Sequence, residues 1–128
     1  MGKGTGDSKK LAIGDFLQEV KQTVTRHGGK DQGWVLVKRK ENMDCLAELE
    51  LGFRDVRDII LDLLVTDYCD GPVPDRDMPG DLWVFGKVIA GKEVYIKLKL
   101  AAFGSLRLVR VVSFHIAGES LCYPYKRK

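Results

Sequence analysis

The first half of the chain carries apolar residues at the spacing of amphipathic helices. From Lys9 to about Arg26 they recur every three or four positions, and the glycines of "HGGK" (27–30) follow where a helix would end. The run "FRDVRDIILDLLV" (53–65) repeats the pattern, with charged residues on its other side. Each segment therefore predicts a helix that packs one face on a core. The apolar positions are Leu11, Ile13, Leu17, Val20 and Val24 in the first, and Phe53, Val56, Ile59, Ile60, Leu63 and Leu64 in the second.

Two shorter elements are predicted between these helices. The run "WVLVKR" (34–39) is rich in β-branched residues and predicts a short strand. Asn42 is a candidate N-cap for a short helix that Gly52 ends. The first half is therefore mainly helical.

Strict alternation replaces the helical spacing in the second half. In residues 93–100 every second side chain is apolar, which predicts a strand with one face on a core and Glu93, Tyr95, Lys97 and Lys99 on the other. A further strand is predicted over residues 106–117. Alternation there places Val112, Phe114 and Ile116 on one face, and Val111, Ser113 and His115 on the opposite one.

The strand before residues 93–100 allows two registers. The run "LWVFGKVI" (82–89) is joined to it at Ala90-Gly91-Lys92. A three-residue loop would place Trp83, Phe85 and Lys87 on the face that carries Tyr95, Lys97 and Lys99, whereas a two-residue turn would place the aromatic side chains in the core. Burial of Val84 and Val88 beside Val94 and Leu98 favours the first register, and the second is the alternative.

The segment "TDYCDGPVPDRDMPGD" (66–81) is rich in proline, glycine and aspartate, which predicts a loop. Its aspartates suggest a metal site, but their spacing is not that of a calcium-binding loop. The order of the elements, helices first and consecutive strands later, predicts an α+β fold: an antiparallel sheet with the N-terminal helices packed on one face. We expect a single domain over residues 1–128, with a flexible start (1–8) and a basic tail (126–128).

Composition is that of an ordinary folded protein, with 45% hydrophobic and 30% charged residues. Apolar runs are too short for a membrane span, and the first residues do not resemble a signal peptide. The three cysteines are scattered and form no CxxC pair, which argues against a disulfide framework or a zinc site. We therefore expect a cytoplasmic protein without a membrane partner, metal or cofactor.

Charge is distributed unevenly along the chain. Residues 51–80 carry three basic and seven acidic side chains, whereas residues 81–128 carry nine basic and three acidic ones. The C-terminal part is therefore suited to a polyanion or to an acidic protein. A surface of solvated lysines is the alternative reading.

The polar face of the predicted strands combines groups that suit RNA. Lysines bind phosphate, and aromatic rings stack on unpaired bases. Cleavage of RNA through its own 2′-hydroxyl requires a base, a cation and an acid, but no metal. The candidate catalytic residues are Tyr95, His115, Lys97 and Lys87, and the candidate substrate-binding residues are Trp83, Phe85, Lys99, Ser113 and Arg110.

Several motifs in residues 50–125 resemble the MqsR family of type II toxin–antitoxin toxins. They are "LLVTDYC-DGP", "LWVFGKVIAGKEVYIKLKL", "VVSFHIA" and "LCYPY". The resemblance implies a RelE-like α+β fold and a metal-independent endoribonuclease that cleaves messenger RNA. It also implies a cognate antitoxin protein as partner. The cleavage sequence and association with the ribosome are left open.

The resemblance carries over to individual residues only in part. The tyrosine of the family's sheet falls on Tyr95, and His115 stands where the family often has a lysine. Asp70 and Val84 stand near positions where the family has a lysine and a glutamine, so neither is a candidate. Lys87 and Lys97 are candidates from the strand pattern alone. Two other classes are considered: a non-catalytic RNA-binding or protein-interaction module, and a metal-dependent nuclease or phosphatase that uses the aspartates of residues 67–81.

Overall fold

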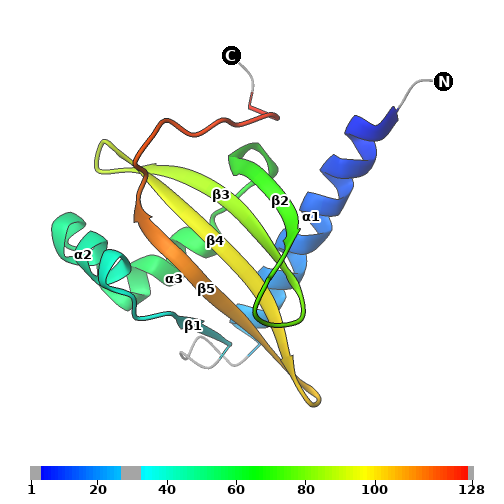
Figure 1. Cartoon of the computed structure of the whole chain (residues 1–128), viewed down its shortest axis with the longest axis horizontal. Coiled ribbons are helices and arrows are strands. Elements are labelled where there is room, and N and C mark those ends of the chain that lie inside the picture. The colour runs from blue at the N-terminus through cyan, green and yellow to red at the C-terminus, as the bar shows by residue number, and fades with distance from the viewer. Residues whose placement is uncertain (1–3, 27–32, 127–128) are drawn as a thin grey trace.

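The computed structural model of the chain describes residues 4–26 and 33–126 (Figure 1). The helices come before the antiparallel strands, with one short strand between the first two helices. In chain order the elements are α1 (Gly4–Thr25), β1 (Trp34–Leu36), α2 (Lys40–Leu49), α3 (Phe53–Leu61), the 3-10 helix η1 (Val65–Asp67), β2 (Tyr68–Pro74), β3 (Asp81–Ile89), β4 (Lys92–Phe103) and β5 (Leu106–Ile116).

The strands form one five-stranded sheet in the order β1-β5-β4-β3-β2. Strands β2 to β5 are antiparallel neighbours, and the short β1 pairs in parallel with β5. Helices α1 and α3 cover one face, and α2 lies beside β5 (Figure 1). The predicted α+β fold, an antiparallel sheet with the N-terminal helices on one face, is confirmed.

The core lies between the helices and the sheet. Ile13 and Val20 of α1 and Ile60 of α3 are fully or almost fully buried against it. The ring of Phe16 stacks on Trp83, with centroids 4.6 Å apart and ring planes 13° from parallel. The predicted apolar faces of α1 and α3 are therefore mostly correct. The exceptions are Leu11, Phe53 and Leu64, which are exposed.

The β3–β4 hairpin adopts the two-residue turn, so the favoured register was wrong. Ile89 pairs with Lys92, and the turn residues Ala90 and Gly91 have φ values of 52° and 80°. Positive φ at both positions is typical of two-residue hairpins, whose twist matches that of the strands. Phe85 therefore lies opposite Ile96 in the core and is fully buried.

A β-bulge in β5 changes the predicted alternation of that strand. Lys97 pairs with Ser113 but the next residue, Leu98, pairs with Val111, which leaves Val112 as the extra residue. An extra residue in a strand reverses the faces of the side chains on one side of it relative to simple alternation. Val111 is therefore fully buried in the core, not beside Ser113 as alternation predicted.

Strand β2 lies inside the segment that was predicted to be a loop. It forms the edge of the sheet and pairs irregularly with β3, with register shifts after Tyr68 and after Asp70. Proline lacks a backbone N–H, so it is tolerated at an edge strand with one free side and at bulges. The proline and glycine content of this segment thus indicated an irregular edge strand rather than only a loop.

Some predicted helix boundaries also differ. Helix α1 begins at Gly4, before the predicted Lys9, and α3 ends at Leu61. The glycines at 27–30, the start at 1–3 and the last two residues of the basic tail lie outside the described residues. Among the helices that are described, none is long and apolar enough to cross a membrane.

Asn42 was predicted to be the N-cap of α2, but the N-cap in the structure is Arg39. Asn42 is instead a buried residue inside the helix. Its side-chain amide donates to the carbonyl oxygens of Val37 (2.8 Å) and Val112 (3.2 Å). Its amide oxygen accepts a hydrogen bond from the backbone N–H of Phe114 at 2.9 Å. Asn42 therefore satisfies the edge of β5 beyond the end of β1, at the site of the bulge.

We expect the variant Asn42→Ala to lower the free energy of unfolding by about 2 kcal/mol or more, because each buried backbone group that loses its partner costs about 1–3 kcal/mol. Urea denaturation followed by circular dichroism measures this loss. The matched control is Glu41→Ala, an exposed neighbour on α2, which should change stability by less than about 0.5 kcal/mol. Equal effects of the two substitutions would contradict a structural role for the Asn42 hydrogen bonds.

Candidate functional site

The sheet face opposite the helices, the outer face, carries most of the candidate residues. The β4–β5 register places three pairs across from one another: Tyr95 with His115, Lys97 with Ser113, and Lys99 with Arg110. Paired residues of adjacent strands have neighbouring side chains on the same face. Five of these residues, Tyr95, Lys97, Arg110, Ser113 and His115, are called the central patch below.

Tyr95 and His115 lie closest together within the central patch. Their rings are stacked, with centroids 5.2 Å apart and planes 17° from parallel. The Lys97 ammonium lies 5.8 Å from the centre of the Tyr95 ring. A phenol, an imidazole and an ammonium group are therefore near enough to contact one substrate group.

The hydrogen bonds of His115 and the burial of Tyr95 determine which protons they offer. His115 Nδ1 lies 3.1 Å from the carbonyl oxygen of Ile116. A carbonyl can only accept, so Nδ1 carries the proton and Nε2 of the neutral ring is left as an acceptor. Partial burial raises the pKa of Tyr95, and the nearby Asp70 and Cys69 raise it further. The Tyr95 hydroxyl therefore stays protonated at neutral pH and acts as a donor.

The C-terminal segment bounds one end of the central patch. It passes across the end of the sheet (Figure 1) and is held by Glu93, whose carboxylate accepts hydrogen bonds from the Tyr123 hydroxyl at 2.7 Å and from the backbone N–H of Leu121 at 3.0 Å. Gly86 lies directly beneath, where any side chain would collide with Tyr123 and Leu121. Burial, followed by the hydrogen bond to Glu93, raises the pKa of Tyr123. Glu93 thus holds the C-terminal segment in place, and the Tyr123 hydroxyl stays protonated and donates to it.

The loop between β2 and β3 bounds the other end of the patch. The Lys99 ammonium donates to Asp75 at 2.7 Å, and the Lys99 side chain is only 3% exposed. Gly80, with φ of 112°, lies against the Lys99 side chain, so the loop covers this lysine. Figure 1 shows the loop in front of the sheet. Lys99 is therefore a structural clamp rather than the freely exposed substrate-binding group that was predicted.

The polar residues of β4 on the outer face thus fall into two kinds. The outer two, Glu93 and Lys99, hold the C-terminal segment and the β2–β3 loop. The inner two, Tyr95 and Lys97, lie between these clamps, and both remain partly exposed. The open part of the outer face is therefore the central patch, apart from Ser113, which is buried.

Besides Lys99, three candidates do not join this patch. Trp83 and Phe85 pack on the helix side with Phe16, so they cannot stack on a ligand at the outer face. Lys87 lies on the same face of β3 as these two residues. Its ammonium pairs with Asp67 at 3.0 Å and with Asp62 at 3.6 Å. The two-residue turn is the cause, because it reverses the face of every β3 side chain.

The aspartates of residues 67–81 do not converge on one point. Asp67 pairs with Lys87, Asp75 pairs with Lys99, and Asp70 binds the backbone N–H of Gly71. Within the described residues, no group of three or more His, Cys, Asp or Glu side chains is placed to hold a metal ion. These side chains therefore support neither the metal-dependent alternative nor a resident metal.

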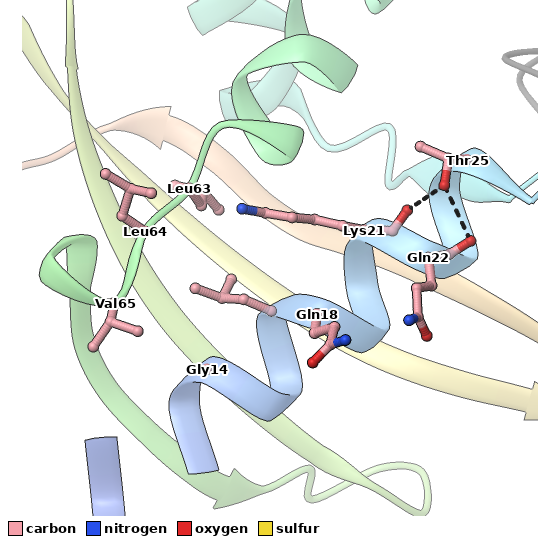
Figure 2. A pocket seen from close by; sticks show the side chains of 9 residues that line it. Gly14, Gln18, Lys21, Gln22, Thr25, Leu63, Leu64 and Val65 are labelled. Atoms are coloured by element: carbon pink, nitrogen blue, oxygen red, sulfur yellow. Dashed lines mark hydrogen bonds between the residues drawn. The ribbon is translucent and has the colours of Figure 1, made fainter. Parts of the chain in front are cut away.

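A separate hollow lies on the helix side, between α1 and residues 63–65. Figure 2 shows the Lys21 side chain extending from α1 toward Leu63, with Gln18 and Gly14 on the helix and Leu64 and Val65 following Leu63 on the segment beside it. Its lining is mainly apolar, and no acid, base and cation converge in it. The groups that suit phosphate chemistry lie instead at the central patch.

Sequence reasoning missed the residues that hold the surroundings of the patch. Glu93 was placed on the correct face, but its bond to Tyr123 joins positions thirty residues apart, and alternation contains no signal for it. The Lys99–Asp75 pair likewise depends on how the β2–β3 loop folds back. Only the small residue Gly86, in a strand of large ones, indicated a close approach of other atoms.

In comparisons with known proteins, no family model, no curated protein and no solved structure gives a significant match to this chain.

The Lys99–Asp75 clamp predicts a pH-dependent stability. The hydrogen bond from Lys99 lowers the pKa of Asp75, so the clamp stabilises the fold above the ordinary aspartate pKa of about 3.9 and is lost as the pH falls through the lowered value. We expect Asp75→Asn to lower the urea midpoint at pH 7 and to differ progressively less from the wild type as the pH falls below that range. The control, Asp77→Asn, replaces an exposed carboxylate of the same loop. A deficit of Asp75→Asn that is equally large at low pH would contradict the clamp.

Proposed function

We propose that the protein is a metal-independent endoribonuclease that cleaves single-stranded messenger RNA at the central patch. The observation that carries the proposal is the grouping of Tyr95, His115 and Lys97 on one open sheet face. These are the three kinds of group that cleavage through the 2′-hydroxyl needs. The resemblance of residues 50–125 to the MqsR toxins is consistent with this chemistry.

Each residue of the cluster has a role that follows from its geometry. His115 Nε2 accepts the proton of the 2′-hydroxyl as the 2′-oxygen attacks the phosphorus. Lys97 stabilises the negative charge that develops on the phosphate oxygens. Tyr95 donates its proton to the 5′-oxygen as the bond from phosphorus to that oxygen breaks. The products are a 2′,3′-cyclic phosphate and a 5′-hydroxyl end.

Arg110 and Ser113 extend the patch along β5. In this proposal Arg110 binds substrate as a second cation for phosphate, whereas Ser113, predicted to bind substrate, is almost fully buried across from Lys97 and supports the patch from within the sheet. Such phosphate contacts make affinity depend on salt.

The proposed biological role is that of the toxin in a type II toxin–antitoxin pair. The resemblance supports this role, and the positive balance of residues 81–128 suits an acidic antitoxin that covers the patch. The protein is proposed to act in the cytoplasm.

A non-catalytic RNA-binding module is the second candidate. The stacked rings of Tyr95 and His115 form a flat surface beside Lys97, and an unpaired base can stack on such a surface without any reaction. The two functions differ in whether RNA is cut.

We expect Tyr95→Phe and His115→Ala each to lower the rate of RNA cleavage by about 10²-fold or more, because a positioned proton donor or acceptor contributes about 10²–10⁴-fold. The assay is gel analysis of a single-stranded messenger RNA incubated with purified protein in EDTA. Binding of the same RNA, measured by fluorescence anisotropy, should change little in Tyr95→Phe.

The matched control is Tyr125→Phe, which removes a tyrosine hydroxyl beside Tyr68 on the helix side. It should cleave at the wild-type rate. Cleavage by Tyr95→Phe and His115→Ala as fast as by the wild type would overturn the assignment of these residues. RNA that is bound but never cut would favour the binding module.

A further inference from the structure

A groove continues from the central patch along the outer face. It has a volume of about 650 Å³ and lies between the β2–β3 loop and strands β4 and β5. Leu108 pairs with Ala101, and Val35 of β1 pairs with Arg110, so these side chains form its floor. The residues that line it include Val35, Met78, Pro79, Ala101, Leu108 and Arg110.

The shape of the groove follows from the clamp and from a small residue. The Lys99–Asp75 pair holds the loop against the sheet, so Met78 and Pro79 form a wall over the floor. Ala101 stands on the outer-facing row of β4, two positions after Lys99, where a larger side chain would fill the space. The groove therefore combines apolar walls with one guanidinium group, which is typical of a site for a flat, partly polar ring.

The charges around the central patch indicate the direction in which a bound RNA chain would continue from it. Beside His115, the hollow at α2 is lined by Glu41, Asp44 and Glu48, and on the other side Asp70 is near enough to raise the pKa of Tyr95. Carboxylates therefore predominate in both directions across the strands, although Asp44 and Glu48 are paired with Lys40 and Lys92. Along the strands, Lys97 is followed by Arg110 at the groove. An RNA backbone is therefore favoured along β4 and β5.

We propose that this groove binds a nucleobase of the RNA a few nucleotides away from the phosphate at Tyr95 and His115, because Ala101 lies six residues beyond Tyr95 on β4, about 20 Å along the strand. The base inserts between Met78 and the floor at Ala101 and Leu108, and the Arg110 guanidinium stacks on it or contacts the adjoining phosphate. Bases outside a duplex are bound in this way by apolar walls and by arginine planes. This inference rests on the proposed RNA-cleaving function and adds to it a site that selects among bases.

The test combines a variant that fills the groove with an RNA that lacks one base. The variant is Ala101→Phe, and the control is Leu11→Phe, which adds the same ring at a position on α1 that is 70% exposed. Both substitutions are made in a protein that already carries His115→Ala, called the parent protein, so that the RNA stays intact. The dissociation constant is measured by fluorescence anisotropy for a short single-stranded RNA and for a series in which each position in turn is abasic.

We expect Ala101→Phe to weaken binding of the complete RNA about tenfold, since a base stacked by a protein contributes about 1–3 kcal/mol. Leu11→Phe should bind as the parent protein does. For the RNA that is abasic at one particular position, Ala101→Phe and the parent protein should have the same dissociation constant, because the base that would contact the groove is missing.

Three results would overturn the inference, and they separate it from the proposed function. If Ala101→Phe binds every RNA as tightly as the parent, the groove holds no base although the function stands. The same conclusion follows if the loss of affinity is equal for all abasic positions. If the parent protein binds no RNA at all, the inference and the proposed function both fail. Melting temperatures of the two phenylalanine variants show that each is folded.

Discussion

The turn at Ala90–Gly91 determines which side chains reach each face of the sheet. Side chains of a strand alternate between faces, so a slip of one residue in the β3–β4 pairing would exchange all of them. The two-residue turn places Trp83 and Phe85 opposite apolar residues of β4, where they pack with Phe16 of α1. The same register removes Lys87 from the outer face. The core and the composition of the central patch therefore depend on this one turn.

Strand β4 distributes four polar residues between structure and proposed chemistry. Glu93 and Lys99 hold two chain segments at the ends of the outer face, and Lys99 is almost completely buried where it pairs with Asp75 of the β2–β3 loop. Tyr95 and Lys97 lie between them and face the open part. The two residues proposed to act on a ligand therefore stand on a rigid strand, and a chain segment bounds them at each end. Asn42 supports it from the other edge, because it fixes the bulge that precedes Ser113 and His115.

The periodic parts of the fold could be predicted from the sequence, and the irregular parts could not. Alternation in β4 predicted the outer positions of Tyr95 and Lys97 correctly, because this strand is long and regular. The bulge at Val112 and the edge strand β2 depend on long-range contacts, so short-range patterns do not reveal them. The hairpin register was wrong because burial of Val84 and Val88 was weighed above burial of two aromatic rings. Val88 is in fact 63% exposed, whereas Phe85 is fully buried, as expected when a larger apolar area contributes more stability.

The central claim is that the central patch cleaves RNA through the 2′-hydroxyl of the substrate, without a metal. The most direct measurement compares one single-stranded RNA with its fully 2′-O-methylated copy, both incubated with the wild-type protein in EDTA. The account predicts that both are bound, that only the unmodified RNA is cut, and that its fragments carry 2′,3′-cyclic phosphate and 5′-hydroxyl ends. Cleavage of the methylated copy, cleavage only when a divalent metal is restored, or binding of both RNAs without any cleavage would contradict it.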